Sequence, residues 1–142
     1  MNINKILKKD LIQIYTNNGF SFEEANTEVD FAIEITSGLT AKDTLIGIMP
    51  DETILKELEE IIKTRVETKK PIAQLLGFSY FMGQKFEVNE HTLIPRPETE
   101  LLVRKAVEII KTNNYKSILD IGTGSGCIAC MIAKLTTAQV WG

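Results

Sequence analysis

Apolar residues recur every three or four positions through the first 76 residues, and this period predicts a series of amphipathic helices. The first helix ends at the Asn17-Asn18-Gly19 turn, and its apolar face comprises Ile3, Leu7, Leu11 and Ile14. Each helix has one apolar stripe that must be buried against another. Residues 1–76 are therefore predicted to form a helical bundle.

Residues that favour helix N-termini mark where the later helices of this segment begin. Ser21, Thr40 and Asp51 are the expected caps, and Glu24 and Asp43 stand three residues after the first two, as in a capping box. The short helix that Thr40 opens is expected to run through Ile46, and Gly38 is the expected end of the helix before it. The positions predicted to face inward are Ala25, Val29, Ala32 and Ile33, then Ile54, Leu58, Ile61, Ile62 and Val66.

The pattern changes after Lys69-Lys70-Pro71. Residues 71–76 are expected to form one more helical turn, closed by Gly77. The β-prone segments 78–82 and 85–88 flank Gly83-Gln84, which predicts a hairpin. A helix starting at Pro97 follows, and its predicted buried side is Leu101, Leu102, Ala106 and Ile109.

The remaining segments predict the opening of an α/β domain. A strand over 117–121, a helix over 127–135 and a second strand from 138 follow the Pro97 helix. The expected fold is thus a multidomain α+β chain. It has a helical bundle over 1–76, a hairpin linker over 77–92 and the beginning of a Rossmann-like domain over 93–142.

Composition narrows the possible partners. The 142 residues include 44% hydrophobic and 25% charged residues, and the net charge is −3 with both signs interleaved. This balance does not favour nucleic-acid binding, and no apolar run is long enough to span a bilayer. Two cysteines make no disulfide framework and the start lacks a signal-peptide core, so a cytoplasmic protein is expected.

The most informative segment is the glycine turn, residues 120–126, which reads Asp-Ile-Gly-Thr-Gly-Ser-Gly. A strand that ends in glycines and enters a helix brings bare backbone N–H groups to a ligand at the positive end of the helix dipole. A dinucleotide fingerprint needs its third glycine at position 127, which is Cys127 here. The predicted cofactor-binding residues are Asp120, Gly122, Thr123, Gly124, Ser125 and Gly126; a purely structural turn is the alternative.

Two other signals are weaker. Cys127 and Cys130 form a C-x-x-C pattern at a helix N-terminus, but helix-on-sheet packing explains both cysteines better than redox chemistry does. His91 is the single histidine and lies in a polar turn, so it is expected to be solvated and no metal site is predicted.

Four segments together resemble the HemK/PrmC family of protein-(glutamine-N5) methyltransferases, which modify peptide chain release factors. The segments are Pro71–Gly77, Phe81–Val88, the Ile-Pro-Arg-Pro-Glu-Thr-Glu stretch over 94–100, and the glycine turn. The resemblance implies S-adenosylmethionine as cofactor. It also implies transfer of its methyl group to the glutamine of the release factor's Gly-Gly-Gln motif, in translation termination, with the helical part recognising the protein substrate.

The resemblance also implies what the sequence lacks. The family's catalytic Asn-Pro-Pro-Tyr motif and the acidic residue after its second strand do not occur by Gly142, so no catalytic residue is assigned. The chain alone is expected to be inactive, to bind cofactor weakly and to self-associate through an unpaired sheet edge, or to be partly disordered after about residue 115.

One more pocket element follows from the resemblance, which places the loop Pro95, Arg96, Pro97, Glu98 and Thr99 beside the cofactor and substrate. Arg96 can meet a carboxylate there, or it can pair with Glu98 or Glu100. The other functions considered are a glutamine methyltransferase acting on a ribosomal protein, an adenine-N6 DNA methyltransferase, and a helical partner-binding module.

Overall fold

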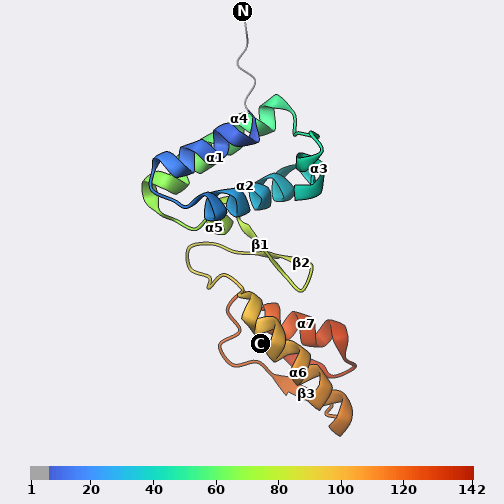
Figure 1. Cartoon of the computed structure of the whole chain (residues 1–142). Coiled ribbons are helices and arrows are strands. Elements are labelled where there is room, and N and C mark those ends of the chain that lie inside the picture. The colour runs from blue at the N-terminus through green and yellow to red at the C-terminus, as the bar shows by residue number, and fades with distance from the viewer. Residues whose placement is uncertain (1–6) are drawn as a thin grey trace, which may run out of the picture. The chain divides into compact units, whose positions relative to one another are not determined.

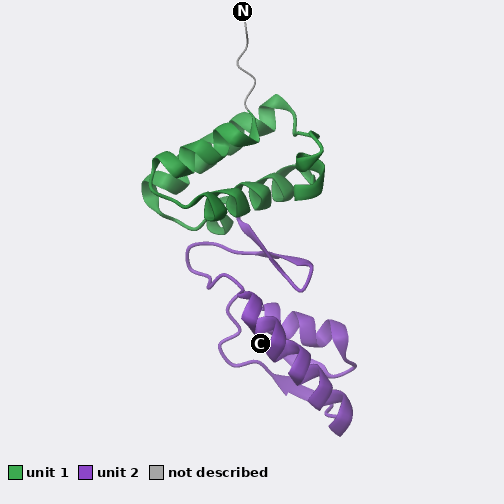
Figure 2. Ribbon diagram, in the orientation of Figure 1, with its two compact units in different colours: residues 1–76 green, residues 77–142 purple. Residues whose placement is uncertain are grey.

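The computed structural model describes residues 7–142 and divides the chain into two units, residues 1–76 and 77–142 (Figures 1 and 2). Within residues 7–76, all regular secondary structure of the first unit is helical. Its helices are α1 (Lys8–Asn17), α2 (Phe22–Ser37), α3 (Ala41–Leu45), α4 (Glu52–Thr68) and α5 (Ile72–Leu76). The second unit contains β1 (Phe78–Phe81), β2 (Gln84–Glu87), α6 (Pro97–Asn113), β3 (Ser117–Leu119), α7 (Cys127–Leu135) and β4 (Gln139–Trp141). Ile3, predicted on the first apolar face, lies outside the described residues.

Side-chain caps set the helix starts of the first unit. Ser21 Oγ accepts from the Glu24 amide at 3.1 Å, and Asp51 Oδ1 accepts from the amides of Thr53 and Ile54. Thr40 and Asp43 form a complete capping box, in which the side chain of each accepts a hydrogen bond from the amide of the other. At Ser21 only half of the box forms, because the Ser21 side chain accepts from the Glu24 amide without the return bond. The predicted caps are therefore confirmed, and Gly38 ends α2 at a φ of 75°.

The core of the first unit lies where α1 packs against α2 and α4, while α5 packs against the same two helices. The predicted inward residues of α2 are confirmed, since all four are fully buried. On α4 the stripe is shifted: Leu55 is buried, and Ile54 and Ile61 are only partly buried. The fully buried members of this core are Leu11, Tyr15, Ala25, Val29, Ala32, Ile33, Leu58 and Ile62.

A polar network that the sequence did not predict also lies in this core. Arg65, on the inward side of α4, donates from Nε and Nη2 to the two carboxylate oxygens of Glu28, each at 2.9 Å. Tyr15 donates its hydroxyl to the same carboxylate at 2.7 Å. Burial, followed by the hydrogen bond to Glu28, raises the pKa of Tyr15 well above its ordinary value. The hydrogen bond to Glu28 likewise raises the pKa of Arg65.

In the second unit, β1 and β2 form the predicted antiparallel hairpin, but its turn is Met82-Gly83 rather than Gly83-Gln84. Both turn residues have positive φ, 49° for Met82 and 71° for Gly83, as a type I′ turn requires. This geometry places Gln84 in the strand. Phe81 is buried and meets Phe86 edge to face, with ring centroids 6.2 Å apart.

The predicted order of helix, strand, helix, strand is observed in α6, β3, α7 and β4. Strands β3 and β4 pair in parallel, with Ile118 opposite Val140. These two residues pack into the core beneath the helices, while Leu119 and Trp141 point to the other face and are exposed. No helix within residues 7–142 has both the length and the apolar character needed to cross a bilayer.

The predicted buried side of α6 is wrong. Val103 and Ile110 are the buried residues, whereas Leu101 is 74% exposed and Leu102 is 57% exposed. Ile109 is also exposed, and only Ala106 of the predicted set packs against the core. Apolar residues occupy more than half of this helix's circumference, so the spacing alone does not decide which stripe meets α7.

Candidate functional site

The glycine turn connects the end of β3 to the start of α7. Its backbone alternates in sign, because Gly122, Gly124 and Gly126 have φ of 79°, 57° and 74°, and Thr123 and Ser125 between them stay in the negative region. L-residues other than glycine enter the positive region at a cost, which explains glycine at alternate positions. Backbone that alternates between the two hands can turn successive N–H groups toward one side, which is how anion-binding concavities are built.

The amides of this turn are available to a ligand. The Gly126 amide closes the turn by donating to the Thr123 carbonyl at 2.9 Å. Within residues 7–142, the amides of Gly122, Thr123, Gly124 and Ser125 donate to no protein acceptor. Helix α7 begins directly afterwards at Cys127, so the positive end of its dipole lies at the same place. The turn therefore suits a carboxylate or phosphate group.

Asp120 supplies a negative charge beside these donors. Its amide donates to the Trp141 carbonyl of β4 at 2.8 Å, which fixes the start of the turn. Its side chain is held through Oδ2, which accepts from Thr123 Oγ1 at 2.8 Å. Oδ1 accepts no hydrogen bond from the described residues. The turn thus offers donors for an anion and a carboxylate for a cation, a combination that fits the zwitterionic end of an amino acid.

A cavity of about 470 Å³ lies against the turn. Gly124 and Ser125 form one side of it, and the other side comes from residues before and after the hairpin: Gly77, Phe78, Glu87, Val88, Asn89 and Thr92. The Val88 amide donates to the Gly77 carbonyl at 2.9 Å, which joins the two ends of the hairpin. Beyond it, Asn89 Oδ1 accepts from the His91 amide and from Thr92 Oγ1, each at 2.9 Å, and this fixes the chain along the cavity.

Contacts with α6 and α7 hold the hairpin in place. The Met82 amide at its tip donates to Glu100 Oε1 of α6 at 2.8 Å. Gln84 Oε1 accepts from Lys134 Nζ of α7 at 2.6 Å. Phe81, Met82 and Phe86 also pack into the core that these helices share. The cavity wall is therefore tied to the same helix that starts at the glycine turn.

The Pro95–Thr99 loop leads into α6, and Pro97 occupies the first turn of that helix as predicted. Arg96 is the residue before it, exposed and extended, with φ −105° and ψ 141°. The alternative in which Arg96 pairs with Glu98 or Glu100 is wrong, because Arg96 forms no ion pair with any described residue. Glu100 instead pairs with Arg104, whose Nη2 lies 3.5 Å from Glu100 Oε2. No residue of the Pro95–Thr99 loop lines the cavity beside the glycine turn.

The cysteines and the histidine carry no evident chemistry. Cys127 is buried and Cys130 is exposed, both as free thiols, so packing accounts for the first only. His91 is exposed, as predicted. No cluster of three metal-ligating side chains occurs between residues 7 and 142.

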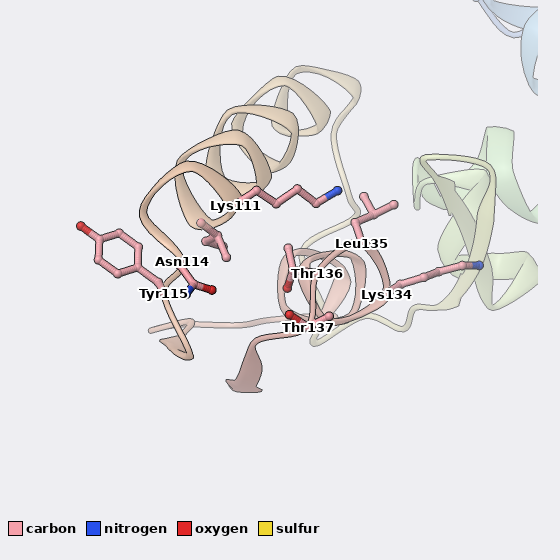
Figure 3. Close-up of a pocket in the computed structure, with 8 residues that line it drawn as sticks. Lys111, Asn114, Tyr115, Lys134, Leu135, Thr136 and Thr137 are labelled. Carbon is pink, nitrogen blue, oxygen red and sulfur yellow. The ribbon is translucent and has the colours of Figure 1, made fainter.

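A second cavity, of about 500 Å³, lies at the opposite end of β3 and β4 (Figure 3). Lys111, Asn114 and Tyr115 line it from the end of α6, and Lys134 to Thr137 line it from the end of α7. In Figure 3, Lys111 extends toward Leu135 and the Tyr115 ring points away from the α7 residues. Ligands of parallel α/β sheets bind beyond the carboxyl ends of the strands. The glycine-turn cavity meets that criterion and the second cavity does not.

Sequence reasoning predicted the glycine turn but missed the facing wall. Phe78 falls in a predicted strand of the hairpin, and Asn89 and Thr92 flank His91 in the polar turn, so neither segment indicated a cavity wall. One signal was present in the sequence: an Asn can close an Asx turn by accepting from the amide two residues later, which is His91 here, and so fix a loop. Nothing local indicated that this loop faces residue 124.

Comparison with known proteins found release factor glutamine methyltransferases among the relatives of this chain. A release factor glutamine methyltransferase of Flavobacterium psychrophilum is 49% identical over 100 residues, which are 68% of this chain and 32% of that protein. Proteins of the same name from Clostridium acetobutylicum and Gloeobacter violaceus are 35% and 36% identical over 138 and 116 residues. Those alignments cover 90% and 80% of this chain, and 46% and 41% of the relatives. The chain thus spans about a third to a half of the length of these relatives, and no family model matches it.

Proposed function

Because this chain is homologous to the release factor glutamine methyltransferases, we propose that it takes part in the same reaction. That reaction is the N5-methylation of the glutamine in the Gly-Gly-Gln motif of peptide chain release factors. The name of the relatives supports a methyl donor, and we propose S-adenosylmethionine. The observation that carries the proposal is the glycine turn. It contains unpartnered amides and the Asp120 carboxylate within a few residues of one another, and its Gly124 and Ser125 line a cavity.

The residues present fit the amino-acid tail of this donor. The free amides of Thr123, Gly124 and Ser125 suit its carboxylate, and Asp120 suits its ammonium group. When bound, S-adenosylmethionine supplies an electrophilic methyl group on sulfur. This chain's contribution is to bind and orient the donor, so that the methyl group has one fixed direction toward the amide nitrogen that accepts it.

Each unit has a proposed part in this function. Residues 93–142 are the beginning of a Rossmann-like methyltransferase domain, and residues 77–92 are the linker whose hairpin forms part of the pocket wall. Residues 1–76 are a helical domain that recognises the protein substrate. The Pro95–Thr99 loop, with the exposed and unpaired Arg96, is proposed to contact cofactor or substrate once either is bound.

The substrate assignment rests on the relatives, whose shared name supports a release factor over a ribosomal protein. A net charge of −3 gives no support to a DNA substrate. Since release factors act in translation, a cytoplasmic location is part of the proposal.

Titration calorimetry of the full-length protein with S-adenosylmethionine and S-adenosylhomocysteine tests the cofactor. Binding of both is expected. Gly124→Ala is expected to weaken binding at least tenfold, because a side chain at this positive φ distorts the turn. Gly38→Ala is the matched control, since it carries the same backbone penalty at a φ of 75° in the other unit. Absence of heat with either ligand, or equal effects of the two variants, contradicts the proposal.

Mass spectrometry of a purified release factor after incubation with the full-length protein and S-adenosylmethionine tests the substrate. One added methyl group on the Gly-Gly-Gln glutamine is expected, and none on a release factor whose glutamine is replaced by alanine. Methylation of a ribosomal protein instead would reassign the substrate.

A further inference from the structure

We propose that Thr123 is a positioning residue that holds the Asp120 carboxylate in the orientation needed to receive the ammonium group of the methyl donor. This inference rests on the proposed function and assigns Thr123 a role separate from that of its backbone amide. It concerns one hydroxyl group, so it can be tested without reshaping the turn.

The geometry that supports it is local. Thr123 Oγ1 donates to Asp120 Oδ2 at 2.8 Å, and Asp120 is only partly buried. A carboxylate has about four lone-pair sites, of which this bond occupies one. Oδ1 accepts no hydrogen bond from the described residues and is available to a cation. An aspartate side chain that is otherwise free to rotate is thereby restricted to one orientation before the ligand arrives.

The Thr123 side chain is partly buried and lies close to Gly142. A Cβ placed on Gly142, just after β4, would come within 2.6 Å of Thr123 Oγ1 and 3.0 Å of Thr123 Cβ. Distances this short show that Thr123 fills the space beside Gly142, and only glycine leaves that space.

The charges are complementary in the arrangement that results. The amides of residues 122–125 present positive partial charge, and the oriented carboxylate places a negative charge at the first residue of the same turn. A zwitterionic tail pairs with both. Thr123 acts on the ammonium half only, because its own amide, which serves the anionic half, does not depend on its side chain.

Affinity measurements with two ligands that differ in this tail test the inference. S-adenosylhomocysteine carries the amino-acid group, whereas 5′-methylthioadenosine keeps the adenosine and the sulfur but lacks that group. In the full-length protein, Thr123→Val preserves the branched shape and removes the hydroxyl. It is expected to weaken S-adenosylhomocysteine binding about tenfold and to leave 5′-methylthioadenosine binding within twofold.

Two further variants complete the design. Thr123→Ser restores the hydroxyl and is expected to recover most of the affinity for S-adenosylhomocysteine. Thr137→Val removes a hydroxyl from an exposed threonine at the other end of the strands and is expected to change neither affinity.

The outcomes distinguish failure of the proposed function from failure of the proposed role of Thr123. If the unsubstituted protein binds neither ligand, the proposed function fails, and the role of Thr123 fails with it. If that protein binds S-adenosylhomocysteine and Thr123→Val binds it equally well, only the role of Thr123 fails. Equal weakening of both ligands by Thr123→Val shows that the hydroxyl merely supports the turn, and this also overturns the inference.

Discussion

Arg65 is a charged residue in the helical core, and its surroundings explain why it is tolerated there. Its side chain is 10% exposed and makes two parallel hydrogen bonds to Glu28, and its guanidinium carbon lies 4.8 Å from the centre of the Phe20 ring. A buried ion pair contributes little net stability, but removing one partner leaves the other charge uncompensated. The cost of substitution should therefore depend strongly on which group is removed.

Arg65→Met is expected to lower the free energy of unfolding by about 3 kcal/mol, because it strands the partly buried Glu28 carboxylate. Lys63→Met is the control on the same helix. Its side chain is 44% exposed and pairs with Glu59 and Glu60, so a change within about 0.5 kcal/mol is expected. Urea unfolding followed by circular dichroism measures both, and equal effects would show that the network contributes nothing specific.

Tyr15 gives the same network a pH dependence. Burial and Glu28 raise its pKa in the folded state above that of an unfolded tyrosine. As the pH rises through the ordinary tyrosine range, the unfolded chain releases this proton first, so stability falls by up to about 1.4 kcal/mol per pH unit. Tyr15→Phe is expected to reduce that alkaline slope, as measured by urea unfolding between pH 8 and about 11. An unchanged slope would assign the effect to other groups.

At the scale of elements, local chemistry was a reliable guide to where helices begin and end. Ser21, Thr40, Asp51 and Pro97 each satisfy a backbone requirement within a few residues, and such requirements are legible in a sequence. The glycine turn could also be predicted, because its positive φ values are a local backbone requirement that glycine meets. What could not be predicted depends on contacts between distant segments: the buried stripe of α6, the Arg65–Glu28 pair and the cavity wall opposite Gly124.

The α6 stripe can be tested directly in the 142-residue chain. Val103→Ala and Ile110→Ala each remove buried methyl groups and are expected to cost about 2 to 3 kcal/mol. Leu101→Gln is the matched control on the exposed side of the same helix, with an expected change of about 0.5 kcal/mol or less. Thermal unfolding of the second unit measures these changes in the free energy of unfolding. A larger decrease for Leu101→Gln than for the two alanine variants would show that the stripe predicted from the spacing is the buried one.

At the scale of the whole molecule, the two units have separate cores. All buried members of the first cluster fall between Leu11 and Ile72, and all those of the second between Phe81 and Ile132. Each unit also has its own polar contacts, the Glu28 network in one and the hairpin contacts to α6 and α7 in the other. A substitution in one core is therefore expected to destabilise that unit without removing contacts from the core of the other.

Residues 1–76 produced alone are expected to fold, because α1, α2, α4 and α5 bury their apolar stripes against one another within that unit. Far-ultraviolet circular dichroism should show a helical spectrum and a cooperative thermal transition, and Leu58→Ala should lower its midpoint. A non-cooperative transition in the isolated unit would show that its stability depends on residues 77–142.

The hydrogen bond from the Asp120 amide to the Trp141 carbonyl has a consequence for the order of events during synthesis. Residues 117–126 leave the ribosome well before residues 139–142, so at first nothing holds the strand from which the turn emerges. The concavity is therefore expected to acquire its final shape only when the later strand pairs with residues 117–119. A nascent chain should accordingly gain affinity for a small molecule in one late step, rather than gradually as the polypeptide lengthens.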